Sequence, residues 1–354
     1  MLFTSCSTPF VKLTSPTTVE IDWLFESPHL KTSSEFSRVD FMGLDEDMRR
    51  FAQRWAGPYR GKERRLQELV HALISPGLLG IRYDETAILT AREVFDVRRA
   101  NCLSFSGLFV AMARDQGLPA YFQEVDTPYQ WDQLREGVII LYRHVNVVVP
   151  LKSGEQIVDM QLNRYKPTYP RRRISDQRAL SLFYNNIAAQ NLFQENYSSA
   201  FEALHKGIQI DPQVAINWSN LGFLFGRVGD SQRAEISYRQ ALAVKPNNPS
   251  AMNNLANIYE KKGESNLARQ LFAASRRHRL RNPYYRYALA QKAYREADYL
   301  EALDLILNAI NLKDKEPLFY RLLAKVYAAK GEGVLERQSL DKAAVLAENE
   351  GGGV

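Results

Sequence analysis

Residues 215–248 read AINWSNLGFLFGRVGDSQRAEISYRQALAVKPNN, and this stretch decides the fold of the C-terminal half of the chain. Its large, small and turn-forming residues stand at fixed places: Trp218, Leu221, Gly222, Phe225, Gly229, Ala234, Tyr238, Ala241 and Pro246. The next 34 residues keep the same kinds of residue at Leu255, Ala256, Tyr259, Gly263, Ala268 and Phe272. The preceding copy keeps Ile187, Ala188, Ala200 and Pro212, and two weaker copies follow around Leu289 and Leu323. The chain therefore repeats with a period of 34 residues from Phe183 onward.

Each copy has the composition of one pair of packed helices. Small residues let the two helices approach closely, large residues fill the space between them, glycine permits the tight turn, and proline marks the end of the unit. One pair cannot bury its apolar face alone, so successive pairs must stack. We therefore expect an all-α solenoid over residues 181–346, followed by a flexible tail at 347–354.

The spacing and the residue types resemble the tetratricopeptide repeat, with its pattern of Trp-x2-Leu-Gly-x2-Tyr followed by Ala, Phe and Pro. The resemblance implies about four to five repeats, because terminal repeats diverge from the pattern. It also implies that the first helix of each pair lines a concave groove. The partner expected in that groove is a protein or an extended peptide.

Asn186, Asn220 and Asn254 are each 34 residues apart and so occupy one repeat position. In some tetratricopeptide proteins an asparagine ladder at this position clamps the backbone of an extended peptide. A side-chain amide suits that task because it offers both a donor and an acceptor. The alternative is that asparagine is simply common before the Leu-Gly pair. The series ends at Ala288, which would limit a ladder to the first three repeats.

The N-terminal half has a different organisation. Residues 7–40 are rich in Ser, Thr and Pro without clear periodicity, and we expect residues 1–40 to be an extended lead-in. Residues 41–165 carry helical patterns followed by β-rich segments, which predicts an α+β domain with an antiparallel sheet. Residues 166–180 are basic and contain proline, and we interpret them as a linker to the repeats.

Particular residues mark the elements of this α+β domain. Asp45 is an N-cap before a first helical pattern, and Asn101 is an N-cap before another. Gly117 is a C-terminal stop for the helix that Asn101 begins. The predicted strands cover residues 118–125, 138–149 and 156–160.

Cys102, His144 and Asp159 follow one another in the order of a thiol nucleophile, its base and the group that orients the base. Cys102 begins the amphipathic helix, where backbone N–H groups and the helix dipole favour a thiolate. If the turn at residues 151–154 has an even number of loop residues, the residue numbers of two cross-strand partners add up to an odd number. The numbers 144 and 159 also add up to an odd number, so both side chains are expected on one face of the sheet. Each residue alone also has a structural interpretation, as a core cysteine, a satisfied histidine or a turn cap.

The sequence around these residues resembles the transglutaminase-like superfamily, which shares its core with papain-type cysteine peptidases. The resemblance covers roughly residues 80–165 and rests on four segments: RANCLSF at 99–105, GLPA at 117–120, RHVN at 143–146 and IVD at 157–159. Bacterial proteins that join such a core to tetratricopeptide repeats belong to the same resemblance. Members commonly have glycine near the cysteine, an aromatic residue after the histidine, and Pro or Thr after the aspartate. This chain has Ala100-Asn101, Val145-Asn146 and Met160 there, so no substrate is implied.

Two functions follow from these patterns. In the first, the chain is an enzyme: Cys102 attacks a peptide amide, His144 shuttles the proton and Asp159 fixes the imidazole tautomer. The acyl group is then transferred to water or to an amine, and the repeats recruit the partner. In the second, the chain is a non-catalytic tetratricopeptide scaffold with a degenerate thiol domain. An intact Cys–His–Asp set favours the enzyme, and a blocked or distant set favours the scaffold.

Composition narrows the classes of partner and cofactor. Hydrophobic residues make up 45% and charged residues 24% of the 354 residues, which is typical of a folded protein. The net charge of +6 comes without a stacking-aromatic motif or a zinc spacing, so we expect no nucleic-acid partner. The two cysteines form neither a disulfide framework nor a metal-ligand pattern, and no cofactor or metal is expected. The oligomeric state is open.

Cys6 ends a short segment, Phe3-Thr4-Ser5-Cys6, that resembles the end of a bacterial lipoprotein signal. The basic and apolar regions of such a signal do not precede it. If the true start lies upstream, we expect a lipoprotein of the cell envelope that meets the membrane only through a lipid on Cys6. The alternative is a cytoplasmic protein with an unmodified Cys6.

Overall fold

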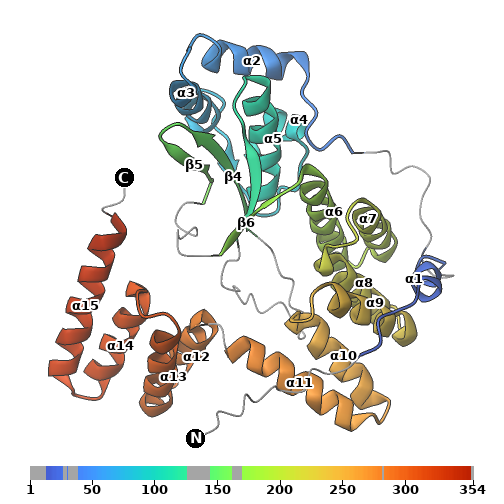
Figure 1. Cartoon of the computed structure of the whole chain (residues 1–354), viewed down its shortest axis with the longest axis vertical. Helices are drawn as coiled ribbons and strands as arrows, with labels where there is room; N and C mark the ends of the chain where they lie inside the picture. Colours follow the sequence, from blue (N-terminus) through green and yellow to red (C-terminus); the bar gives the residue numbers. More distant parts are fainter. Residues whose placement is uncertain are drawn as a thin grey trace, which may run out of the picture. The chain divides into compact units, whose positions relative to one another are not determined.

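The computed structural model describes residues 13–26, 30, 39–125, 144–161, 170–280 and 283–351 (Figure 1). These residues form two compact units, the first reaching Ile258 and the second beginning at Tyr259. Within the first unit, the described helices and strands ahead of the repeats are α1 (Thr18–Leu24), α2 (Glu46–Ala56), α3 (Lys62–Ile74), β1 (Arg82–Tyr83), α4 (Ala91–Val97), β2 (Arg99–Ala100), α5 (Cys102–Asp115), β3 (Tyr121–Val125), β4 (His144–Leu151), β5 (Gly154–Val158) and β6 (Arg171–Ile174).

The main sheet of the first unit has the order β5-β4-β3-β6, and every neighbouring pair is antiparallel. A short parallel pair, β1 with β2, leads into α5. Figure 1 shows α5 lying against the sheet, and the inward-facing valines of β4 join the apolar residues of α5 in one core. The α+β architecture with an antiparallel sheet, predicted from the order of helical and β-rich segments, is therefore present in this half of the chain.

Part of the segment predicted as a linker at 166–180 is a strand instead. Residues 171–174 form β6, which pairs with β3. The reason is that its basic side chains find partners: Arg172 donates to the buried Glu124 carboxylate at 2.6 Å, and the Arg173 guanidinium lies over the Tyr121 ring at 4.4 Å. Ile174 is buried in the core. The basic run is thus an edge strand of the sheet.

The first repeat continues the core of the α+β domain. Phe183, in the first repeat helix, packs against Phe41 with ring centroids 4.7 Å apart. Ala179, Leu182 and Val214 belong to the same buried cluster as the apolar residues of α5. The α+β domain and the first repeats therefore form one packed body, and the predicted boundary between them is not a separation in space.

The repeat region is all-helical, as predicted. Its helices are α6 (Asp176–Phe193), α7 (Tyr197–Ile210), α8 (Ala215–Arg227), α9 (Ser231–Val244), α10 (Pro249–Lys261), α11 (Ser265–Leu280), α12 (Pro283–Arg295), α13 (Tyr299–Leu312), α14 (Pro317–Ala329) and α15 (Gly333–Gly351). The turn between the two helices of each pair holds one residue with positive φ, at Glu195, Gly229, Gly263, Ala297 and Gly331. These residues are each 34 apart, so the period read from the sequence is the period of the backbone.

Both predicted terminal segments contain helix. Residues 18–24, inside the lead-in predicted as extended, form α1, and Thr17 and Glu20 make a reciprocal capping box at its start. At the other end, α15 runs to Gly351 and so includes residues expected in the flexible tail. Among the described residues, no helix combines the length and apolar character that crossing a membrane requires.

Candidate functional site

Cys102 is the first residue of the 14-residue helix α5. The N-cap predicted at Asn101 is confirmed, because its side chain accepts a hydrogen bond of 2.9 Å from the Ser104 N–H. The Asn101 N–H in turn donates to the Ala87 carbonyl at 3.1 Å, which fixes the entry of the chain into the helix. The half-buried thiol therefore stands at the positive end of a well-anchored helix.

Ser106 connects the start of α5 to the strand that carries His144. Its hydroxyl donates to the Cys102 carbonyl at 2.7 Å and lies 3.3 Å from the carbonyl of Val145. Ser106 is buried, so these contacts are shielded from water. Because Val145 follows His144 directly, this hydroxyl holds the cysteine helix and the histidine strand at a fixed separation.

His144 is the first residue of β4 and contacts both of its predicted partners. Its Nε2 hydrogen-bonds the Asp159 Oδ2, and Cys102 lies close enough to the ring to raise the pKa of His144. With Nε2 directed at the carboxylate, Nδ1 is the ring nitrogen left to face the thiol. Burial disfavours the imidazolium, but the hydrogen bonds and charges of Asp159 and Cys102 outweigh it and raise the pKa of His144 to about 10.

Asp159 follows the last residue of β5, and its side chain is buried. Its Oδ1 accepts a hydrogen bond of 2.8 Å from the Gln161 N–H, while Oδ2 faces His144. The β4–β5 turn contains two residues, 152 and 153, between the paired Leu151 and Gly154. The residue numbers of paired residues in β4 and β5 therefore add up to an odd number, as those of His144 and Asp159 do. Both side chains lie on one face of the sheet, as predicted from the sequence.

Two further polar residues lie beside this cluster and were missed in the sequence. Asn146, 1% exposed, donates from its side-chain amide to Asp159 Oδ2 at 3.3 Å. Gln123 on β3 is its cross-strand partner and is also buried. Among the described residues, the side-chain oxygens of both amides have no hydrogen-bond partner. The available signal was the alternation of His144 and Asn146 in a strand whose other buried residues are valines, since buried polar groups in such a strand need partners.

This arrangement has the connectivity that nucleophilic catalysis by a thiol needs: a nucleophile, a base within hydrogen-bond reach and a buried group that orients the base. A metal centre is not indicated, because the described part of the chain contains no cluster of at least three His, Cys, Asp or Glu side chains suited to a metal ion. The roles of Cys102, His144 and Asp159 stay a prediction that the geometry permits.

The three asparagines of the proposed ladder have unequal surroundings. Asn220 on α8 is buried and donates to the side-chain oxygen of Asn185 at 2.8 Å. Asn254 on α10 hydrogen-bonds the Tyr238 hydroxyl. Asn186 on α6 is half-buried, and none of the described residues hydrogen-bonds its side chain. Two of the three amides thus contribute to packing between helices, and a role in peptide binding stays a prediction.

Cys6 and Arg143 lie outside the described residues. The lipidation expected at Cys6 is therefore a prediction without structural support, and the same holds for the compartment that depends on it.

The comparisons with known proteins concern the repeats. Two family models described as tetratricopeptide repeat match residues 215–248 and 237–270. The protein named Photosystem I assembly protein Ycf3 from Prochlorococcus marinus (strain NATL1A) is 33% identical over 93 residues, which are 25% of this chain and 53% of that protein. Tetratricopeptide repeat protein 16 from Homo sapiens is 30% identical over 102 residues, 29% of this chain and 12% of that protein. The chain thus spans about half the length of the Ycf3 protein it matches.

Among solved structures, a crystal structure of MamA protein covers 49% of this chain and 94% of its own, with 16% sequence identity and a TM-score of 0.27. The matched family models lie wholly inside the repeats, so the resemblance of residues 80–165 to the transglutaminase-like superfamily stays a prediction. The helix pairs, the 34-residue period of their turns and the matched family models agree, and the C-terminal half of this chain contains tetratricopeptide repeats.

Proposed function

We propose that this protein is a scaffold whose tetratricopeptide repeats hold a protein partner while a larger complex is assembled. The observation that carries the proposal is the unbroken 34-residue period of helix pairs, because such an array presents a long surface without needing it for its own core. The relative named as a photosystem I assembly protein supports a role in assembly. The identity of the complex is not carried over from it.

The first helices of the pairs supply the proposed binding groove. Asn186 on α6 is the groove candidate whose side-chain amide keeps its hydrogen-bonding capacity for a partner. A photo-crosslinking residue placed at 186 in the full-length chain should trap the partner in cells. The same residue at the exposed Arg269, on a second helix, is the matched control and should not. If position 269 traps the same partner and position 186 does not, the groove is not the binding surface.

A second candidate function is thiol-dependent hydrolysis or acyl transfer on peptide amides. The observation that favours it is the cluster in which His144 hydrogen-bonds Asp159 and lies beside Cys102. In this proposal, the Cys102 sulfur attacks the amide carbonyl carbon and a carbon–sulfur bond forms. The carbon–nitrogen bond then breaks, and His144 gives its proton to the departing amine.

The second half of the reaction regenerates the thiol. Water or a second amine attacks the thioester, His144 accepts its proton, and the carbon–sulfur bond breaks. Asp159 keeps the imidazole oriented throughout. The backbone N–H of Cys102 is the expected donor to the developing oxyanion. This cluster does not specify a substrate. In this proposal the substrate is the partner protein that the repeats hold.

Alkylation of the thiol tests the second candidate apart from the first. Iodoacetamide should modify Cys102 at pH 6–7 faster than it modifies glutathione, because a thiolate paired with imidazolium is the reactive species. His144→Ala should slow the reaction, as followed by mass spectrometry of the intact protein. If Cys102 reacts no faster than glutathione and His144→Ala changes nothing, the enzyme proposal fails while the scaffold proposal stands.

A further inference from the structure

Residues 13–26 form a short segment that has the character of a bound peptide. Its helix α1 has seven residues, fewer than the roughly 12–15 that an isolated helix needs to be stable in water. Within α1 only Leu24 is buried, and Val19 is 78% exposed. The segment therefore owes its helical conformation to the surface on which it lies.

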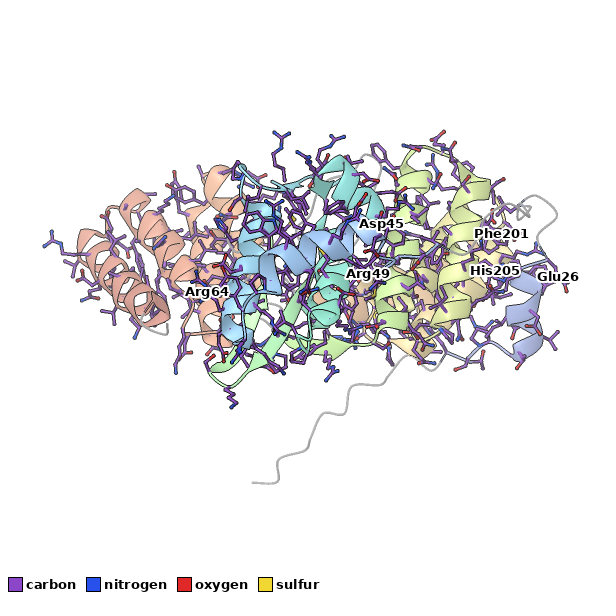
Figure 2. All side chains as sticks on the ribbon, turned by 90° about the horizontal axis from the view of Figure 1, so that it is seen from above. Glu26, Asp45, Arg49, Arg64, Phe201 and His205 are labelled. Atoms are coloured by element: carbon purple, nitrogen blue, oxygen red, sulfur yellow. The ribbon has the colours of Figure 1, made fainter. Side chains whose placement is uncertain are left out.

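That surface belongs mainly to the second helices of the first two repeats, with Trp218 added from the first helix α8. Phe25 stacks on the His205 ring with centroids 4.2 Å apart, and it lies 6.2 Å from Phe201 and 6.3 Å from Trp218. Figure 2 labels Phe201 and His205 on α7, together with Glu26 at the end of the segment. The aromatic side chain of the segment thus packs against an aromatic cluster of the repeats.

Two arginines of α9 hold the segment at its two ends. The Arg233 guanidinium lies 3.8 Å over the Trp23 ring and donates to the carbonyls of Trp23 and Glu26, each at 3.3 Å. These carbonyls are at the C-terminal end of α1, where a positive charge is favourable. Arg239 donates to the Thr14 carbonyl at 2.9 Å and pairs with Glu20 at 3.2 Å.

The aromatic residues Phe201 and His205 have no aromatic equivalents in the later repeats. Phe201 and His205 occupy repeat positions that hold Arg269 and Ala273 two repeats later, 68 residues on. Arg269 and Ala273 are exposed, whereas Phe201 is fully buried. Phe201 and His205 therefore occur in the repeat where the segment docks, whereas the third repeat has exposed residues at the same positions.

We propose that Phe201, His205, Trp218, Arg233 and Arg239 form a second peptide-binding site on the repeats, which residues 13–26 fill in cis. In trans it would take a short amphipathic helix of a partner protein. That helix carries a Trp-x-Phe pair at its C-terminal end and an acidic residue three positions before the tryptophan. The site lies mainly on the second helices, whereas the asparagine positions lie on the first, so this proposal goes beyond the groove and does not rest on it.

The segment has the features of a displaceable ligand. Most of its polar contacts are made by main-chain carbonyls to arginine side chains, which any helix of suitable shape can offer. Short elements with few buried side chains open at low free-energy cost relative to the core. Releasing it would leave α7 and α9 packed on their own helix partners.

The test uses the full-length chain and a fluorescein-labelled synthetic peptide of residues 13–26. The double variant Trp23→Ala/Phe25→Ala should empty the site in cis. Fluorescence anisotropy should then show saturable binding of the peptide to this variant, and binding at least tenfold weaker to the wild-type chain. Adding Arg239→Glu to the double variant should abolish binding. Adding Arg269→Glu, at an exposed position of the next repeat, is the matched control and should leave it unchanged.

Four results would overturn the proposal. The first is the absence of saturable binding to the double variant, and the second is equal binding to the wild-type chain. The third comes from hydrogen exchange on the wild-type protein, which does not depend on any variant folding. Amides of residues 18–25 should exchange faster than those of α7 and α9; equal protection would make the segment a fixed part of the fold. The fourth is a wild-type chain that forms concentration-dependent dimers which the double variant does not form. In that case the site binds a second copy of the chain, and the partner proposed here is wrong.

Discussion

Asn146 donates a hydrogen bond of 3.3 Å to the Oδ2 of Asp159, the same carboxylate oxygen that the His144 ring contacts. The carboxylate is therefore held from both sides, by the imidazole and by a buried amide, while Gln161 holds its other oxygen. Since the Asp159 carboxylate orients the His144 ring, Asn146 acts on Cys102 only through Asp159 and His144. It is a positioning residue of the proposed thiol site.

Replacing Asn146 by alanine should slow the thiol without unfolding the protein. A hydrogen bond to a charged group contributes about 1.5–3 kcal/mol net, and only part of this loss reaches the sulfur. We expect the alkylation rate of Cys102 at pH 7 to fall by roughly threefold to tenfold, since 1.4 kcal/mol corresponds to a factor of ten. Ser153→Ala, in the exposed β4–β5 turn, should leave the rate unchanged. An unchanged rate in Asn146→Ala would remove the positioning role.

The raised pKa of His144 predicts how its contribution to stability depends on pH. Because the folded-state pKa, about 10, exceeds the ordinary value of 6.5, the imidazolium stabilises the folded state fully below pH 6.5. This stabilisation is lost progressively as the pH rises toward 10. The difference in unfolding free energy between wild type and His144→Gln should therefore be largest near pH 6 and should shrink up to pH 10. Urea denaturation at several pH values measures it, and a difference that grows with pH would contradict the pairing.

The inter-helix turns offer a stability prediction that does not involve the site. Ala297 has φ of 61°, where its equivalents Gly229 and Gly331 have 82° and 76°. Holding a residue with a side chain in the left-handed region destabilises the folded state by about 1–2 kcal/mol. Replacement by glycine removes this cost, but the greater conformational entropy of glycine in the unfolded chain offsets about 0.4–1 kcal/mol of the gain. Ala297→Gly should thus raise the unfolding free energy by about 0.5–1 kcal/mol.

The neighbouring repeats provide the controls for this prediction. Glu195, also at φ of 61°, should gain less from glycine because it loses its 2.9 Å ion pair with Arg227. Gly229→Ala should lower stability by about 1 kcal/mol. Among the described residues, no atom beyond the adjacent ones lies within 4 Å of the added Cβ, so the loss comes from the backbone conformation. Denaturation midpoints of the three variants measure this order of stabilities. An Ala297→Gly variant less stable than the wild-type chain would contradict the prediction.

The repeats were predictable from the sequence because each conserved repeat position encodes one packing contact. Small residues at Ala234 and Ala241 are buried where helices approach, and Gly229 takes the positive φ that the turn needs. The helix cap at Asn101 was predictable for the same reason, since capping is local. Features that depend on one neighbouring residue could therefore be derived from the sequence.

Features that depend on a distant partner could not. Residues 171–174 form a strand beside β3, where Glu124 and Tyr121 are partners for Arg172 and Arg173. The segment that contains α1 lies on α7 and α9. In the site, the order of cysteine, histidine and aspartate is visible in the sequence. The contributions of Ser106 and Asn146 are not, because they require knowing which strand lies opposite.

The last prediction separates the two interpretations of the asparagine positions. Asn220 is only 9% exposed and donates to Asn185 at 2.8 Å, so Asn220→Ala leaves a buried acceptor without its donor. We expect it to lower the unfolding free energy by about 0.5–1.5 kcal/mol, the net value of a neutral hydrogen bond. Asn186 is half-buried, and Asn186→Ala should stay within about 0.5 kcal/mol of wild type.

Binding of the cellular partner should follow the opposite order, with Asn186→Ala weakening it although the fold is intact. Thermal denaturation and partner co-purification, measured on both variants, give the comparison. If Asn186→Ala destabilises the chain as much as Asn220→Ala, both positions are structural and no ladder exists. If neither variant changes partner binding, the first helices of these repeats hold the partner through other side chains.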